Sequence, residues 1–85
     1  MDLITLIETL ESNLSREIVG TNYGGTVSYA ASTPKTVTID NDEFLQTNRL
    51  CLLVVNNITY LYVSSYGFKK TVKVAISGIE SITIT

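Results

Sequence analysis

The fold of this 85-residue chain is decided by one stretch, Leu50-Cys51-Leu52-Leu53-Val54-Val55-Asn56-Asn57-Ile58-Thr59-Tyr60-Leu61-Tyr62-Val63. Its first six residues are all apolar, whereas a strand with one face in water alternates apolar and polar residues. The run therefore predicts a strand that is covered on both faces. Asparagine tolerates a positive φ, so Asn56-Asn57 predicts a two-residue hairpin turn into the next strand.

This turn sets the pairing register, because a slip of one residue would exchange the two faces of the sheet. We expect the pairs Val55–Ile58, Leu53–Tyr60 and Cys51–Tyr62 on one face, and Val54–Thr59, Leu52–Leu61 and Leu50–Val63 on the other. A second hairpin, closed by Tyr66-Gly67 with an even-numbered loop, adds Val72, Val74 and Ile76 to the aliphatic core face. The second, more aromatic face then consists of Cys51, Leu53, Val55, Ile58, Tyr60, Tyr62, Thr71, Lys73 and Ala75.

Shorter strands are expected on either side of these hairpins. Residues 26–30 and 35–40 alternate apolar and polar side chains, and Ser32-Thr33-Pro34 interrupts the alternation. Phe44 and Leu45 are expected to return to the core. After a turn at Ser77-Gly78, a last strand contains Ile79, Ile82 and Ile84.

The N-terminal segment predicts an amphipathic helix within residues 1–19. Its apolar residues recur at spacings of three and four, which places them on one stripe: Leu3, Leu6, Ile7, Leu10, Leu14 and Ile18. Asp2 is expected to cap the first turn, and Gly20 to end the helix. The stripe packs either on the sheet of the same chain or on a partner.

Together these elements predict a single α+β domain over residues 1–85. The helix precedes about six antiparallel strands within residues 26–85, which form a strongly twisted sheet or a small open barrel. A chain of this size buries only about 60–65% of its unfolded surface, so the expected core is small.

The composition indicates association rather than chemistry. Hydrophobic residues make up 45% of the chain and charged residues only 16%, against about 25% in ordinary domains. The net charge of −2 argues against a general binder of nucleic acid or anionic membranes. Cys51 is expected to be a buried small hydrophobe. Without a signal-peptide pattern or an apolar run of about 18 residues, we expect a cytoplasmic or particle-associated protein.

The residue types needed for common catalytic and metal sites are missing. The chain has no histidine and a single cysteine, which removes the usual triads and zinc clusters. We read the acidic residues Asp40, Asp42 and Glu43 as a solvated turn rather than a calcium loop. The glycines of residues 20–26 lack the lysine of a phosphate loop. We therefore expect no enzyme, no catalytic residue, no cofactor and no metal.

Two groups of residues are candidates for binding. Aromatic and basic side chains interleave along one hairpin: Tyr60, Tyr62, Tyr66, Phe68, Lys69, Lys70 and Lys73. Such a set is typical both of protein interfaces and of sheets that bind single-stranded nucleic acid. The last strand, with Ile82 and Ile84, lacks the proline or charge that protects an edge, so we expect edge pairing through residues 80–85 or 35–40.

The stretch Val74-Ala75-Ile76-Ser77-Gly78-Ile79-Glu80-Ser81-Ile82 resembles the ending of Sm-like and SH3-like small barrels, and is also similar to the last strands of bacterial PH-like domains. The chain lacks the Asp-x-x-x-Asn-type RNA pocket of the Sm pattern. The resemblance implies a helix followed by about five bent strands, and assembly by edge-strand pairing between subunits. In size and style the chain also resembles phage-encoded inhibitors and small coat components.

The resulting hypothesis is a non-enzymatic protein–protein interaction module of a phage or bacterium. It would be either a self-assembling structural component, forming a homo-oligomer, or a small inhibitor that binds a larger protein. The alternative is a small barrel that binds single-stranded nucleic acid.

Overall fold

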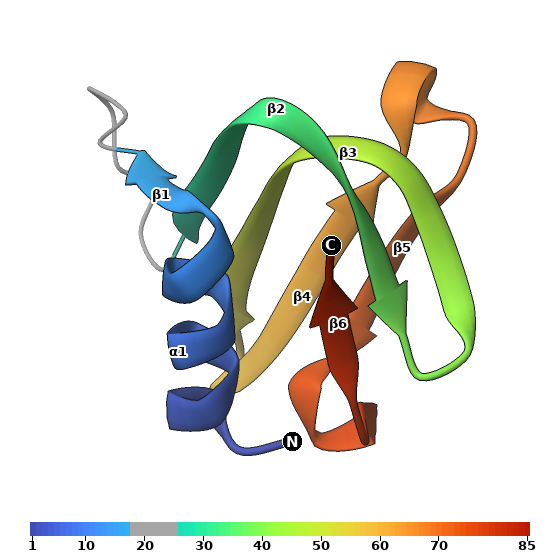
Figure 1. Cartoon of the computed structure of the whole chain (residues 1–85). Helices are drawn as coiled ribbons and strands as arrows, with labels where there is room; N and C mark the ends of the chain where they lie inside the picture. The colour runs from blue at the N-terminus through green and yellow to red at the C-terminus, as the bar shows by residue number, and fades with distance from the viewer. Residues whose placement is uncertain (18–25) are drawn as a thin grey trace.

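The computed structural model describes residues 1–17 and 26–85, with the backbone alone for Phe68. In chain order the elements are α1 (Leu3–Asn13), β1 (Ser15–Glu17), β2 (Thr26–Ile39), β3 (Asp42–Val55), β4 (Ile58–Ser64), the short 3₁₀ turn η1 (Tyr66–Phe68), β5 (Thr71–Ala75), a second 3₁₀ turn η2 (Ile76–Gly78) and β6 (Ile82–Ile84). The predicted α+β class is confirmed (Figure 1). The predictions for Ile18, Gly20 and the glycines of residues 20–25 lie outside the described residues.

The strands form one antiparallel sheet that bends over its own core. Its order is β1-β2-β3-β4-β5, and β6 pairs with the second half of β2. Figure 1 shows β2 and β3 arching together over the top of the molecule, with β6 in front and β4 and β5 behind. Among the described strands, no pairing joins β5 to the first half of β3, so the sheet does not close into a barrel.

The central hairpin has the expected register. All six predicted pairs between β3 and β4 are present, and both turn residues have positive φ, 51° at Asn56 and 64° at Asn57. Val72 and Val74 lie beside Val63 and Leu61, as the even-numbered loop predicts. Ile76 lies beyond the end of β5, in η2, but it is partly buried and packs against the core.

The helix is shorter than the apolar pattern predicted. Asp2 caps it as expected, since its carboxylate accepts from the Thr5 backbone N–H. Leu6 and Leu10 are fully buried against the sheet. Residues 15–17 are not helical, because they pair with Ser28–Ala30 as strand β1 and Leu14 is already extended. The sheet ladder thus satisfies the backbone groups that a longer helix would have used.

The first two predicted strands are one bent strand. Ser32-Thr33-Pro34 lies inside β2 and does not end it, because four residues of β2 bulge out opposite Asn48 of β3. A second irregularity sets Leu45 and Gln46 opposite Thr36. Leu45 was predicted to be in the core but is 59% exposed, because two consecutive residues at a bulge lose the alternation of the strand.

The core is aliphatic with two aromatic rings. It is formed by residues from α1, both halves of β2 and β3, β4 and the C-terminal segment: Leu6, Leu10, Leu14, Tyr29, Val37, Ile39, Phe44, Leu50, Leu52, Leu61, Val63, Ile79 and Ile84. Burial, followed by the nearby Glu11 carboxylate, raises the pKa of the Tyr29 hydroxyl, which therefore stays protonated at neutral pH. In the described part of the chain, no helix has the length and apolarity needed to cross a membrane.

Candidate functional site

The outward side of β3, β4 and β5 carries apolar side chains that no described element covers. We call this surface the outer face, and it consists of Cys51, Leu53, Val55, Ile58, Tyr60, Tyr62, Lys73 and Ala75. The register places these residues between the buried positions Leu50, Leu52 and Leu61. Val55 and Ile58 at the hairpin end are 48% and 45% exposed. Helix α1 packs mainly against β6, β1 and β2, and so leaves the outer face open.

The few charges around the outer face already have partners. The Lys73 ammonium lies 5.0 Å from the centre of the Tyr60 ring, a cation–π contact that covers one face of that ring. At the β1 side, Arg49 donates to Glu17 at 2.9 Å. The outer face is therefore mainly apolar, and Lys73 is its one charged side chain.

Cys51 belongs to this face and is half-buried, not buried as predicted. It pairs with Ser28 and Tyr62 and lines a hollow of about 340 Å³ with them. Its alternation with the core residues Leu50 and Leu52 explains the difference, because the apolar run supplies both faces of the strand. Burial raises the pKa of the Cys51 thiol.

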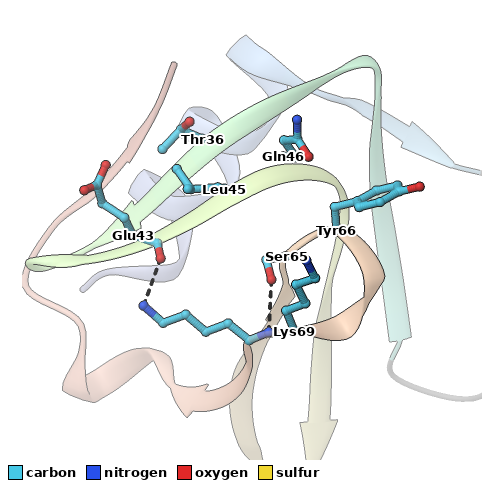
Figure 2. A pocket seen from close by; sticks show the side chains of 8 residues that line it. Thr36, Glu43, Leu45, Gln46, Ser65, Tyr66 and Lys69 are labelled. Carbon is cyan, nitrogen blue, oxygen red and sulfur yellow. Dashed lines mark hydrogen bonds between the residues drawn. The ribbon is translucent and has the colours of Figure 1, made fainter.

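A second candidate surface lies where the sheet fails to close. We call it the seam hollow, an open depression of about 580 Å³ beside the first half of β3. It is lined by Thr36, Glu43, Leu45, Gln46, Ser65, Tyr66, Lys69 and Lys70. Figure 2 shows Glu43, Leu45 and Gln46 along the β3 side, with Ser65, Tyr66 and Lys69 on the segment around η1 opposite them.

Lys70 links the two sides of the seam hollow. Its ammonium forms an ion pair with Asp42, donates to the Glu43 carbonyl at 2.9 Å and lies 4.7 Å from the centre of the Phe44 ring. Its backbone N–H donates to the Ser65 hydroxyl at 3.0 Å. The stem of Lys70 thus lies across an edge of β3 that no described strand pairs with.

The predicted binding residues are spread over two adjoining surfaces. Tyr60, Tyr62 and Lys73 lie on the outer face, and Lys69 and Lys70 line the seam hollow. Tyr66 lines both the seam hollow and the hollow beside Cys51 and Tyr62. Tyr66 is 70% exposed. The side chain of Phe68 lies outside the described residues.

The last strand is placed differently from the prediction. Ile84 is buried in the core and Ile82 is half-buried. Residues 82–84 pair with Val37–Ile39 of the same chain. Residues 80–85 and 35–40 were expected to pair between molecules, and this internal pairing occupies one edge of each segment. Replacing Ile84 with lysine is therefore expected to unfold the chain rather than release a folded monomer.

Sequence reasoning missed two contributions. Asp40 was read as part of a solvated turn, yet its carboxylate accepts from the backbone N–H groups of Glu80 and Ser81, both at 3.0 Å. Leu45 and Gln46 were not predicted as surface residues. The bulge in β3 is what brings Leu45 and Gln46 to the seam hollow. Neither residue type predicts a bulge or a surface position there.

Among the described residues, no group of three or more His, Cys, Asp or Glu side chains is arranged to hold a metal ion. In comparisons with known proteins, no protein-family model, no curated protein and no solved structure matched this chain significantly. The resemblance to Sm-like and SH3-like barrels stays a prediction.

Proposed function

We propose that the protein is a non-enzymatic protein-binding module whose outer face packs against the outer face of a second copy. The observation that carries this proposal is the apolar surface formed by Leu53, Val55, Ile58, Tyr60 and Tyr62, of which Val55 and Ile58 are exposed and the other three half-buried. Two sheets that pack face to face lie about 10 Å apart and interdigitate such side chains. Because hydrophobic contact is non-directional, the apolar part of this face is complementary to the same part of a second copy.

Face-to-face packing is favoured over pairing of strand edges. The terminal strands β1 and β6 have three residues each, and β5 has five. β1 carries Arg16 and Glu17, and β5 carries Lys73. Short edges with charged side chains are how proteins avoid pairing with further strands. Association between copies of the chain would suit a structural component. If the protein were monomeric, its outer face would instead have to bind a different protein.

The nucleic-acid alternative finds less support in the geometry. Lys73 covers a face of the Tyr60 ring that a base would need for stacking, and Asp42 neutralises Lys70. Lys69 and Lys70 also line the seam hollow, whereas Tyr60 and Lys73 lie on the outer face. A salt-dependent shift with a labelled single-stranded oligonucleotide would revive this alternative.

The proposal is tested by sedimentation over a range of protein concentrations. Ile58→Lys places a charge on the outer face at a side chain that is 45% exposed, so the monomer should still fold. The matched control is Ile4→Lys, which replaces an isoleucine of α1 that is 66% exposed and lies off the outer face. We expect the wild type and Ile4→Lys to dimerise and Ile58→Lys to stay monomeric.

Two results would overturn the proposal. One is a wild-type protein that stays monomeric at millimolar concentration. The other is an Ile58→Lys variant that dimerises as tightly as Ile4→Lys while circular dichroism shows both to be folded.

A further inference from the structure

The two ends of the outer face differ in shape along the same pair of strands. At the end beside the β3–β4 turn, Val55 and Ile58 pair with one another and are 48% and 45% exposed. At the other end, Cys51 and Tyr62 pair with one another and line the hollow of about 340 Å³. Four residues along β3 separate Cys51 from Val55, a distance of about 13 Å in an extended strand. We call the first end the hairpin tip and the second the Cys51 hollow.

The walls of the Cys51 hollow suit an apolar side chain of another protein. Tyr62 lines it from β4 and Tyr66, which is 70% exposed, lines it from η1. Arg49 also lines it, and its guanidinium is paired with Glu17 at 2.9 Å, so the hollow brings no uncompensated charge from this residue. Tyrosine and arginine are the residue types that most often anchor protein interfaces. The volume lies within the range of about 300–1,000 Å³ typical of binding sites.

Symmetry restricts how two copies of the outer face can meet. Sheets that pack face to face keep their strands roughly aligned, so the twofold axis of a dimer runs either along the strands or across them. An axis along the strands would place tip on tip and hollow on hollow. An axis across the strands places each hairpin tip on the Cys51 hollow of the other copy, because both features lie on β3 and β4.

Packing favours the axis across the strands. Two hollows that face one another leave their walls without contacting atoms, whereas a tip in each hollow gains those dispersion contacts. The same rotation brings Lys73 of each copy nearer to Ala75 of the other copy than to the other Lys73, because the strands run in opposite directions. The only charged side chains of the outer face therefore do not oppose one another.

We propose that the two copies of the outer-face dimer are antiparallel, and that Val55 and Ile58 of each copy insert into the Cys51 hollow of the other. This inference rests on the self-association proposed above and adds the partner of the hollow, which is the β3–β4 turn of a second copy. The two contacts are equivalent, so each chain supplies one tip and one hollow.

Complementary charges test this arrangement. Ile58→Lys and Tyr66→Glu change exposed side chains, so circular dichroism should show both monomers folded. Each variant alone should dimerise at least roughly tenfold more weakly than the wild type, because a charge enters an apolar contact. An equal mixture should form a heterodimer in sedimentation, since the introduced ammonium meets the introduced carboxylate and the second contact keeps its wild-type residues. Tyr66→Lys is the matched control, and its mixture with Ile58→Lys should stay monomeric.

Cross-linking gives an independent measure of the same geometry. Ile58→Cys adds a thiol at the hairpin tip, and a short bifunctional maleimide should then yield a covalent dimer that joins residue 58 of one copy to Cys51 of the other. Mass spectrometry of the digested dimer identifies the link. Adding Cys51→Ser should abolish the covalent dimer, because the two tips lie at opposite ends of the interface. Ile4→Cys, on α1 and off the outer face, is the matched control and should give no link to Cys51 of another copy.

The outcomes separate this arrangement from the self-association on which it rests. A wild-type protein that stays monomeric at millimolar concentration would overturn both. If the wild type dimerises but the mixture of Ile58→Lys and Tyr66→Glu is no more dimeric than either variant alone, only the arrangement is overturned. A covalent dimer of the Ile58→Cys, Cys51→Ser double variant would also overturn it, because the tips would then meet one another.

Discussion

Asp40 joins two parts of the chain that are about forty residues apart in sequence. Its carboxylate accepts from the backbone N–H groups of Glu80 and Ser81, and its own N–H donates to the Ser81 carbonyl at 2.9 Å. The residue has a φ of 55°, which aspartate tolerates better than most residues. It thus holds the segment that leads into β6 against the β2–β3 turn.

We predict that Asp40→Ala lowers the free energy of unfolding by about 1–3 kcal/mol, because it removes a charged acceptor shared by two N–H groups. Asp40→Asn should recover part of the loss, since an amide oxygen can accept in the same place. Asp42→Ala is the control, because its exposed ion pair with Lys70 contributes at most about 1 kcal/mol. Urea denaturation measures all three, and equal losses for Asp40→Ala and Asp42→Ala would contradict this role.

The elements differ in how far local rules determine them. The β3–β4 hairpin could be predicted residue by residue, because Asn56-Asn57 sets the turn and the apolar pattern then allows one register. The first half of β3 could not. Between Asp42 and Leu50 the buried residues are Phe44, Thr47 and Leu50, a spacing of three that two bulges against β2 create. Bulges depend on how a long strand bends around the core, which no short sequence window contains.

The hairpin turn gives a prediction at the element scale. Asn57→Gly should leave stability unchanged or slightly raise it, because glycine adopts a positive φ without steric cost. Asn57→Val should lower the free energy of unfolding by about 1–2 kcal/mol. Asn41→Val is the matched control, since Asn41 lies in a turn but is not among the residues with positive φ. If both valine variants unfold at the same urea concentration, the turn conformation is not what stabilises the hairpin.

The helix gives a second prediction at this scale. Leu10 is fully buried between α1 and the sheet, so Leu10→Ala should cost about 2–4 kcal/mol of unfolding free energy. Ile4→Ala, on the same helix but 66% exposed, should cost less than about 1 kcal/mol. Thermal and urea unfolding give both values. A Leu10→Ala variant as stable as Ile4→Ala would mean that α1 does not pack on its own sheet in solution.

At the scale of the whole molecule, two consequences of the bent sheet divide the candidate binding residues. β6 closes onto β2 within the chain, which buries Ile84 and uses the edge expected to pair with other molecules. η1 lies beside the first half of β3, which places Lys69 and Lys70 at the seam hollow and Tyr66 between this hollow and the one beside Tyr62. Both arrangements bring together residues that are distant in sequence. Residue type and spacing therefore identified most of the candidate binding residues, but they could not show which of them lie on the same surface.

If a second copy covers the outer face, the accessibility of Cys51 reports on it directly. The thiol is half-buried on that face, and its raised pKa leaves less thiolate at neutral pH, so native labelling should already be slower than in denaturant. The labelling rate should increase as the pH rises toward the thiol's pKa.

The decisive measurement is the rate of Cys51 labelling at constant reagent excess and pH, over increasing protein concentration. We expect the labelling rate to fall as the dimer forms, and we expect this fall to be absent in Ile58→Lys but retained in Ile4→Lys. A wild-type rate that stays constant up to millimolar protein would contradict it, because the outer face would then remain open to solvent at every concentration.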